Sequence, residues 1–220
     1  MTREMKEVEV TAMAATKYIG IVLFPIVEEL DFVGPFEVFG GLTFQDREWK
    51  AVTISETGEP VKAANGLSVN VDYSFDDAPR LDVILVPGGV GTRTESENPR
   101  MVEFVQKAGN EASYVTSVCT GAFILHAAGF LSGKRATTHW GVIQALRDLP
   151  DVEVIEERFV HDGKVITSAG VSAGIDMSLY LVSLLKDAQT ALNVQKMMEY
   201  YPEPPTFAEP ALSKAEGATA

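Results

Sequence analysis

The sequence predicts an α/β fold with a mainly parallel central sheet sandwiched by helices, in a single domain. Short apolar, β-branched runs alternate with helical segments along the chain, which is typical of strands buried on both faces of a parallel sheet. A length of 220 residues suits one domain with a large core. Polar or glycine-containing segments directly follow several of the runs, at the carboxyl edge where such sheets bind ligands.

The first half of the chain contains three predicted strands, and each is a nearly continuous apolar run. They are expected at 18–24, 50–54 and 81–86. A helix is expected to begin at Pro35, because proline is favoured in a first helical turn, after a loop or helix entry at 28–35. Residues 60–75 suit short strands or an extended crossover, and residues 99–112 suit a surface helix with one apolar side.

In the second half, a β-branched run at 114–118 predicts a buried strand that leads straight into a helix at 120–128. Gly129 is a stop signal for this helix. Ser172 is a candidate cap for a helix at 173–185. The other expected elements are a helix at 140–149 ended by Pro150, a strand at 152–154, a hairpin at 158–167 with Asp162-Gly163 at its turn, and a last helix at 187–201.

Charge and composition exclude several classes of function. The chain has 18 Lys and Arg against 31 Asp and Glu, a formal net charge of −13, which disfavours binding to nucleic acid or anionic membranes. No apolar run reaches the length of about 18 residues that a membrane-spanning helix needs. One cysteine forms no internal disulfide, which fits a cytoplasmic location. We expect a flexible N-terminal arm at 1–16, an α/β domain at 17–201 and a flexible C-terminal tail at 202–220.

Cys119 is the leading candidate for a catalytic nucleophile. It lies at the joint between the predicted strand at 114–118 and the helix at 120–128, the arrangement of a nucleophile elbow. Backbone N–H groups at a helix N-terminus favour thiolate, so we expect the pKa of Cys119 to lie below the free value of about 8.5. The alternative is a buried cysteine that acts as a small hydrophobic side chain.

Asp31, Gly88-Gly89 and Cys119 each follow a predicted strand. Because the carboxyl ends of parallel strands share one edge of a sheet, we expect these residues to converge there. Backbone N–H groups of a glycine loop can approach a developing oxyanion closely. Each residue also has a plainer interpretation: the glycines form a tight turn, and Asp31 is a solvated carboxylate or a helix cap.

Several stretches of the chain resemble the ThiJ/PfpI superfamily, over roughly residues 17–200. This resemblance implies a flavodoxin-like fold of the class I glutamine amidotransferase-like type. Within the superfamily, the stretches are most similar to the isocyanide hydratase branch, which has Asp at the acidic position, here Asp31, rather than the commoner Glu. The stretches are LDFVGP at 30–35, VPGG at 86–89, VTSVCTG at 115–121, GKRATTHW at 133–140 and SAGVSAGID at 168–176.

The same stretches also resemble the N-terminal domain of AraC-type transcription regulators. Those regulators carry a C-terminal pair of helix-turn-helix units, which we expect a chain of this length not to hold, and the net charge of −13 disfavours DNA binding. The protease and deglycase-like branch of the superfamily usually has His directly after the nucleophilic Cys. Here that position is Thr120, so a peptide-hydrolysing Cys-His pair at adjacent positions is disfavoured.

The resemblance implies addition of water to an isocyanide to give an N-substituted formamide. Cys119 would form a covalent thioimidate, and Asp31 would act as general acid and base with its pKa raised by the nearby thiolate. The backbone N–H groups of Gly89 and Thr120 would stabilise negative charge, and the Thr120 hydroxyl would bond within the pocket. The remaining candidate pocket residues are Gly88, Val90, Val171 and, as an outer partner, His139.

We expect no metal, because His, Cys and carboxylates show no metal-ligand spacing, and we expect no cofactor. The expected partners are a small-molecule substrate and, from the resemblance, a second copy of the chain in a homodimer. Two alternatives to isocyanide hydration stay open. One is another cysteine-dependent hydrolase, amidase or glyoxalase-type enzyme of the superfamily. The other is a non-enzymatic redox or ligand sensor in which Cys119 oxidises to a sulfinate.

Overall fold

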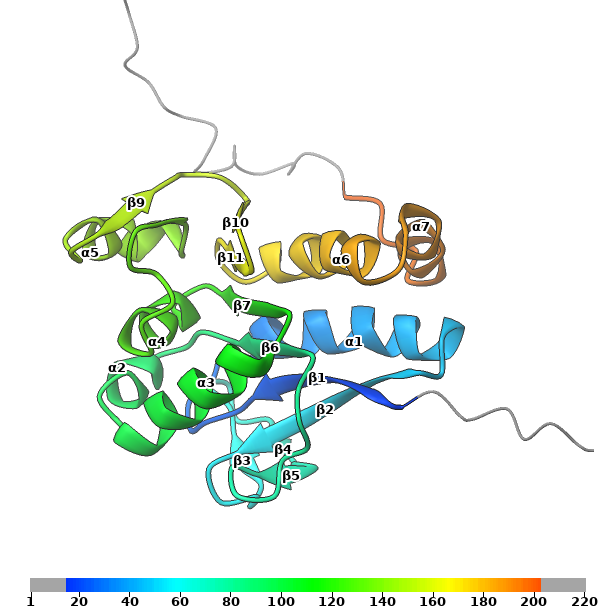
Figure 1. Ribbon diagram of the computed structural model, residues 1–220, viewed down its shortest axis with the longest axis horizontal. Helices are drawn as coiled ribbons and strands as arrows, with labels where there is room; N and C mark the ends of the chain where they lie inside the picture. Colours follow the sequence, from blue (N-terminus) through cyan, green and yellow to red (C-terminus); the bar gives the residue numbers. More distant parts are fainter. Residues whose placement is uncertain (1–14, 203–220) are drawn as a thin grey trace, which may run out of the picture.

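The structure of the chain is a computed structural model that describes residues 15–202. A seven-stranded sheet in the order β10-β11-β7-β6-β1-β2-β5 forms its centre (Figure 1). All neighbouring strands in this sheet pair in parallel except β10, which runs antiparallel to β11. The predicted α/β fold with a mainly parallel central sheet is therefore confirmed.

The apolar runs of the sequence form the strands of this sheet, and β6 is buried along its whole length. The strands are β1 (Lys17–Val22), β2 (Trp49–Ser55), β5 (Tyr73–Ser74), β6 (Val83–Val86), β7 (Tyr114–Val118), β10 (Phe159–Asp162) and β11 (Val165–Ser168). Two small sheets accompany it: β3 (Val61–Lys62) with β4 (Ser68–Val69), and β8 (Lys134–Ala136) with β9 (Val152–Val154). The predicted strand at 152–154 is β9, which pairs with β8 outside the main sheet. The sequence did not predict β8.

Helices cover both faces of the sheet (Figure 1). On one face α1 (Glu29–Gln45), α6 (Ala173–Leu185) and α7 (Ala188–Met197) pack against one another. The other helices are α2 (Thr92–Glu95), α3 (Pro99–Glu111), α4 (Gly121–Ala127), the 3₁₀ turn η1 (Trp140–Val142) and α5 (Ile143–Arg147). Of these, α3 and α4 pack together on the opposite face from α1.

The first helix begins earlier than the sequence predicts. It starts at Glu29 and contains Pro35 in its interior, so the expectation of a helix start at Pro35 was wrong. Proline has no N–H to donate to the carbonyl of Asp31, four residues earlier, and so removes one helical hydrogen bond. The helix continues through this position because it buries a continuous apolar side, which includes Phe32 and Phe39. Asp31 therefore lies in the first turn of a helix and not in a loop.

Three local predictions in the second half need correction. The helix expected at 140–149 is a 3₁₀ turn followed by the short α5, because the side chain of His139 accepts the Gly141 N–H and holds a tight turn there. Ser172 makes no capping hydrogen bond to α6; its hydroxyl instead accepts from Arg158. In the hairpin, Asp162 is still paired with Val165, so the two-residue turn lies one position later than expected.

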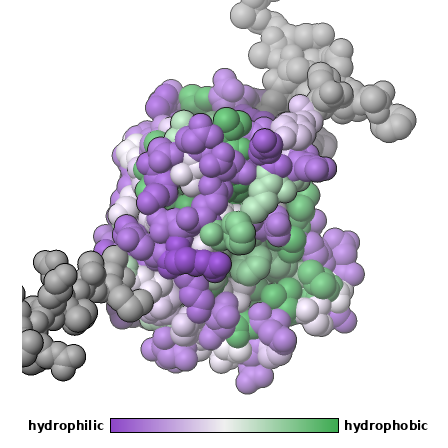
Figure 2. All heavy atoms as spheres, turned by 90° about the vertical axis from the view of Figure 1, so that its right-hand side faces the viewer, coloured by the Kyte–Doolittle hydropathy of each residue, from purple (hydrophilic) through white to green (hydrophobic). Residues whose placement is uncertain are grey.

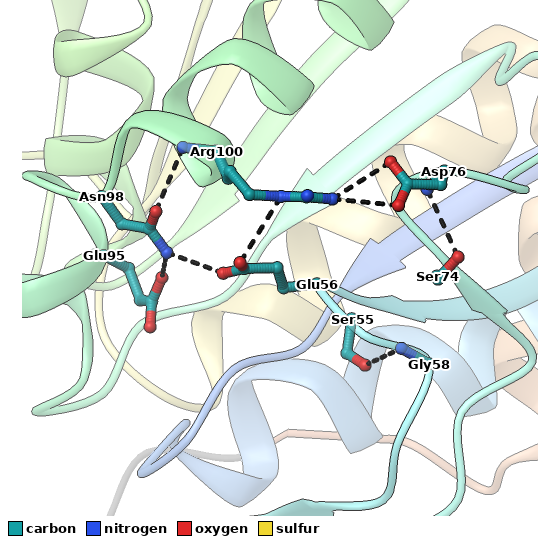
Figure 3. Close-up of polar contacts among 8 residues, drawn as sticks. All are labelled: Ser55, Glu56, Gly58, Ser74, Asp76, Glu95, Asn98 and Arg100. Atoms are coloured by element: carbon teal, nitrogen blue, oxygen red, sulfur yellow. Dashed lines mark hydrogen bonds and ion pairs between the residues drawn. The ribbon is translucent and has the colours of Figure 1, made fainter.

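A polar network anchored by Arg100 ties loops together beside the sheet (Figure 3). The Arg100 guanidinium contacts both carboxylate oxygens of Asp76, at 3.0 and 3.1 Å, and lies 3.5 Å from Glu56. The side chain of Asn98 donates to Glu56 and to Glu95, each at 2.9 Å. Exposed ion pairs contribute little one by one, but this network connects the segments after β2 and β5 to the start of α3.

The surface is not uniformly charged. Figure 2 shows hydrophobic side chains gathered in the middle and lower part of one side of the molecule. On α1, Leu30, Val33 and Phe36 are each at least 37% exposed, and a pocket of about 450 Å³ lies between α1 and the β4 segment.

The homodimer that the resemblance implies stays a prediction. The predicted arm at 1–16 and tail at 202–220 lie outside the described residues, apart from residues 15, 16 and 202.

Candidate active site

Asp31, Gly88 and Cys119 come together at the carboxyl edge of the sheet, as predicted. They follow β1, β6 and β7, which are adjacent strands. The Gly88 N–H donates to Oδ2 of Asp31 at 2.9 Å. The side chain of Asp31 is fully buried and Cys119 is only 7% exposed, and each of the two side chains affects the pKa of the other, so they form a buried carboxyl–thiol pair.

Cys119 occupies a strained turn between β7 and α4. Its φ is +56°, in the left-handed region that non-glycine residues rarely adopt. Its N–H is shared between the carbonyls of Ser168 and Ala169, both at 3.1 Å, and its carbonyl accepts the Thr138 hydroxyl at 2.7 Å. These hydrogen bonds hold a conformation that costs about 1–3 kcal/mol. The predicted elbow geometry is therefore present.

A glycine is required immediately after this turn. A side-chain carbon at Gly121 would lie 2.1 Å from the carbonyl oxygen of Val86. The chain can thus leave Cys119 and enter α4 directly against the end of β6 only without a side chain at this position. This close approach brings the thiol to the loop that carries Gly88.

The carboxyl of Asp31 holds its proton more tightly than an ordinary aspartate. Burial raises the pKa of Asp31 to about 7, the Gly88 hydrogen bond lowers it, and the negative charge of Glu28 raises it again. Oδ1 is buried and has no hydrogen-bond partner among the residues that the structure describes. Near neutral pH this carboxyl is therefore poised to accept or release a proton.

The pKa of Cys119 is raised, whereas the sequence predicted a lowered one. Burial raises the pKa of the thiol to about 12, the charge of Asp31 adds to the effect, and the Thr120 N–H opposes it. The expectation failed because a helix N-terminus at the surface favours thiolate, but here desolvation outweighs the backbone N–H. The thiol is thus protonated at rest, and the nearby base that can remove its proton is Asp31.

The glycine loop at 88–89, which is the candidate segment for binding an oxyanion, already makes hydrogen bonds within the protein. The Gly89 N–H donates to the Thr120 hydroxyl at 2.9 Å, and this hydroxyl donates back to the Gly89 carbonyl at 3.2 Å. The Gly88 N–H is bonded to Asp31. The side chain of Thr120 therefore holds the glycine loop in place, and the Thr120 N–H is the donor near the sulfur.

The other predicted site residues lie around this pair at different depths. Val90 is 56% exposed at the end of the glycine loop. Val171 has a left-handed φ of +50°, and its N–H lies close enough to the Asp31 carboxyl to lower the carboxyl's pKa. His139 packs on Gly170, where a side-chain carbon would lie 2.1 Å from Cδ2 of the imidazole. His139 therefore supports the segment that carries Val171.

Sequence reasoning missed two residues that contribute to the pair. Glu28 acts on the Asp31 carboxyl through its charge, and Thr138 holds the carbonyl of Cys119. A signal for Thr138 was its place in the GKRATTHW stretch. No comparable local signal marked Glu28, because its effect depends on the burial of Asp31.

A methyl group at Gly88 is expected to disrupt the pair. The added carbon of Gly88→Ala would lie 2.6 Å from the Thr120 nitrogen and 2.7 Å from Oδ2 of Asp31, so we expect a loss of roughly 1–3 kcal/mol in the free energy of unfolding. Urea denaturation measures it. Gly40→Ala is the matched control, because nothing lies within 4 Å of its added carbon and alanine favours the helix by about 1 kcal/mol. Equal stabilities of the two variants would contradict the geometry.

The buried carboxyl of Asp31 predicts a pH-dependent stability difference. Between pH 4 and 7 the folded chain keeps a proton that the unfolded chain has lost, so raising the pH favours unfolding. The free energy of unfolding of Asp31→Asn should therefore rise relative to that of the wild type as the pH increases through this interval. We expect the difference to reach roughly 4 kcal/mol at pH 8 and to stay constant at higher pH. Urea denaturation at pH 4 and pH 8 tests this. Glu111→Gln, which alters an exposed carboxylate, serves as control; a pH-independent difference for Asp31→Asn would refute the prediction.

The described residues contain no group of three or more His, Cys, Asp or Glu side chains that could hold a metal ion. Among them, no helix is long and apolar enough to cross a membrane. Neither observation bears on residues 1–14 or 203–220. The predictions of no metal and no cofactor stay predictions.

The fold and the site together define an α/β protein with a cysteine at a strand-to-helix elbow and a buried acidic partner. The model of the DJ-1/PfpI family matches residues 17–184. The chain belongs to the DJ-1/PfpI family, which confirms the resemblance in the sequence.

Named relatives differ in what they do. The chain is 42% identical to an isonitrile hydratase of Pseudomonas putida, over 85% of this chain and 80% of the relative. It is 35% identical to the transcriptional regulator CdhR of Pseudomonas aeruginosa, over 65% of this chain but only 43% of the regulator. A crystal structure of a ThiJ/PfpI family protein from Pseudomonas syringae matches with a TM-score of 0.82 and 34% identity, over 94% of this chain and 85% of that one.

Proposed function

We propose that the protein is an isocyanide hydratase, which adds water to R–N≡C to give R–NH–CHO. The single observation that carries this proposal is the buried pair of Asp31 and Cys119, in which a carboxyl with a pKa of about 7 lies beside a protonated thiol. The similarity of this chain to an isonitrile hydratase, over most of both chains, supports the same reaction. Fold alone would not, because one fold hosts many activities.

In the first step, the sulfur of Cys119 forms a bond to the terminal carbon of the isocyanide. Asp31 takes the thiol proton as the sulfur attacks and delivers a proton to the same carbon, which yields the thioimidate Cys–S–CH=N–R. The proton moves from sulfur to carbon through the carboxylate, so Asp31 returns to its ionised form. A free thiolate is not required before substrate binds, which agrees with the raised pKa of Cys119.

In the second step, water adds to the thioimidate carbon. The Asp31 carboxylate accepts a proton from the attacking water and passes it to the substrate nitrogen, which gives the adduct Cys–S–CH(OH)–NH–R, and it then accepts the proton of the adduct's hydroxyl group. Collapse of the tetrahedral adduct breaks the carbon–sulfur bond, expels the Cys119 sulfur and releases R–NH–CHO. The sulfur regains the remaining proton from Asp31, so one water is consumed and the pair is restored.

The other two functions are less well supported by this geometry. A hydrolase that uses a Cys-His pair at adjacent positions would need a histidine at position 120. This chain has Thr120 there, and its hydroxyl accepts a hydrogen bond from Gly89. A redox sensor that relies on an exposed, low-pKa thiol is disfavoured by the 7% exposure and raised pKa of Cys119. A small-molecule substrate is the partner that such a closed pair suits.

The test is to mix the purified protein with para-nitrophenyl isocyanide and follow formation of the N-formamide by ultraviolet absorbance. We expect steady turnover at many equivalents of product per chain. A parallel sample with methylglyoxal tests the glyoxalase-type alternative, and intact mass after peroxide treatment tests the sensor. An inert wild type in the first assay, with turnover of methylglyoxal or stoichiometric oxidation, would replace the proposal.

A further inference from the structure

The segment 169–172 joins β11 to α6 and lies against both members of the candidate pair. The carbonyl of Ala169 accepts the Cys119 N–H at 3.1 Å, and the Val171 N–H lies beside the Asp31 carboxyl. Val171 is a β-branched residue in the left-handed region, with a φ of +50°. Such a conformation is strained and persists only where the surroundings hold it. Some contact must therefore fix this segment.

Arg158, which precedes β10, contacts the segment from both ends. Its carbonyl accepts the Ala169 N–H at 2.9 Å, and its guanidinium donates to the Ser172 hydroxyl at 3.3 Å. The same guanidinium forms an ion pair with Asp176 in the first turns of α6. Tyr200, beyond the end of α7, also contacts this ion pair. Figure 1 shows the start of α6 beside β10 and β11.

We propose that Arg158, paired with Asp176, is a positioning residue for the reaction of Cys119 and Asp31. It holds segment 169–172 so that the backbone of Val171 stays directed at Asp31 while Ala169 stays bonded to Cys119. Arg158 touches neither the thiol nor the carboxyl, so it acts through this segment. The inference rests on the proposed function for its effect on turnover, but not for its effect on the thiol.

An effect on the site can be separated from an effect on stability. The side chains of Arg158 and Asp176 are 47% and 22% exposed, and ion pairs with so much exposure contribute little to folding. A displaced backbone beside reacting groups, in contrast, can slow chemistry by up to about 100-fold for a shift of 1 Å. The ion pair of Arg147 with Glu156 is similarly exposed, at 41% and 45%. It involves no residue of segment 169–172 and is a matched control.

The experiment compares Arg158→Met, Arg158→Lys and Arg147→Met with the wild type. It measures the rate of Cys119 alkylation by iodoacetamide, kcat and KM for para-nitrophenyl isocyanide, and the thermal midpoint. For Arg158→Met we expect kcat to fall about 10-fold with KM within about two-fold. We also expect alkylation to rise at least about three-fold, because a loosened segment uncovers the sulfur. Arg158→Lys keeps the charge and should recover most of kcat, and Arg147→Met should match the wild type.

The alkylation rates test the inference even if the protein does not hydrate isocyanides. A rise in Arg158→Met alone supports the positioning role with or without turnover. Unchanged alkylation in Arg158→Met would overturn it. So would equal changes in Arg158→Met and Arg147→Met, or a loss of kcat that only follows a lowered thermal midpoint.

Discussion

Cys119→Ala is expected to lose isocyanide turnover on the order of 10⁴-fold or more, because the sulfur forms the covalent bond on which both steps depend. Alanine fits the same space, and Cys119 lies at a buried position, so the fold should persist. The measurement is kcat/KM for para-nitrophenyl isocyanide with the thermal midpoint of the same sample. Cys119→Ser should be almost as inactive, because a hydroxyl gives up its proton far less readily than a thiol.

Ser117→Ala provides a matched control for the loss of Cys119. Ser117 lies two residues earlier on the buried strand β7, and its hydroxyl has no partner in the described part of the chain. Removing this hydroxyl should leave turnover within about three-fold and stability equal or higher. If Cys119→Ala kept a tenth of the wild-type rate, the covalent mechanism would be ruled out.

Asp31→Asn is expected to lower kcat for the isocyanide by about 10²–10⁴-fold, the usual contribution of a general acid–base group. The amide fills the same buried site but transfers no proton, so sulfur attack and water addition both slow. This loss should accompany the gain in stability expected above pH 7, because the charge that the wild type buries there costs folding free energy. Opposite changes in activity and stability are the signature of a functional buried carboxylate.

Glu29→Gln is the control for this substitution on the same helix. The carboxylate of Glu29 is outside the pair and accepts hydrogen bonds from Asn65, at 2.6 and 2.7 Å. We expect its kcat within about two-fold of the wild type. An Asp31→Asn variant as active as Glu29→Gln would show that proton transfer runs through another group.

The sequence by itself was sufficient to predict the fold class and the convergence of the candidate site residues at one edge of the sheet. Continuous apolar runs such as β6 have the composition that is typical of a strand buried on both faces, and parallel strands place their carboxyl ends together. Cys119 and Gly88 could thus be assigned to one edge of the sheet from their positions after two such runs. The hairpin turn and α6 were equally local, and their predicted bounds were accurate to within a residue.

Tertiary structure alone decided the protonation of the pair and the course of α1. Local sequence rules favoured a helix start at Pro35 and a low pKa for Cys119, since proline and a helix N-terminus act on near neighbours. Packing of the apolar side of α1 outweighed the proline, and burial outweighed the backbone N–H beside the thiol. Burial depends on every segment that covers an atom, including segments far away in the chain. The protonation of Cys119 and Asp31 is therefore a property of the folded molecule. Their convergence at one edge of the sheet, in contrast, could be predicted from the sequence, because each follows a predicted parallel strand.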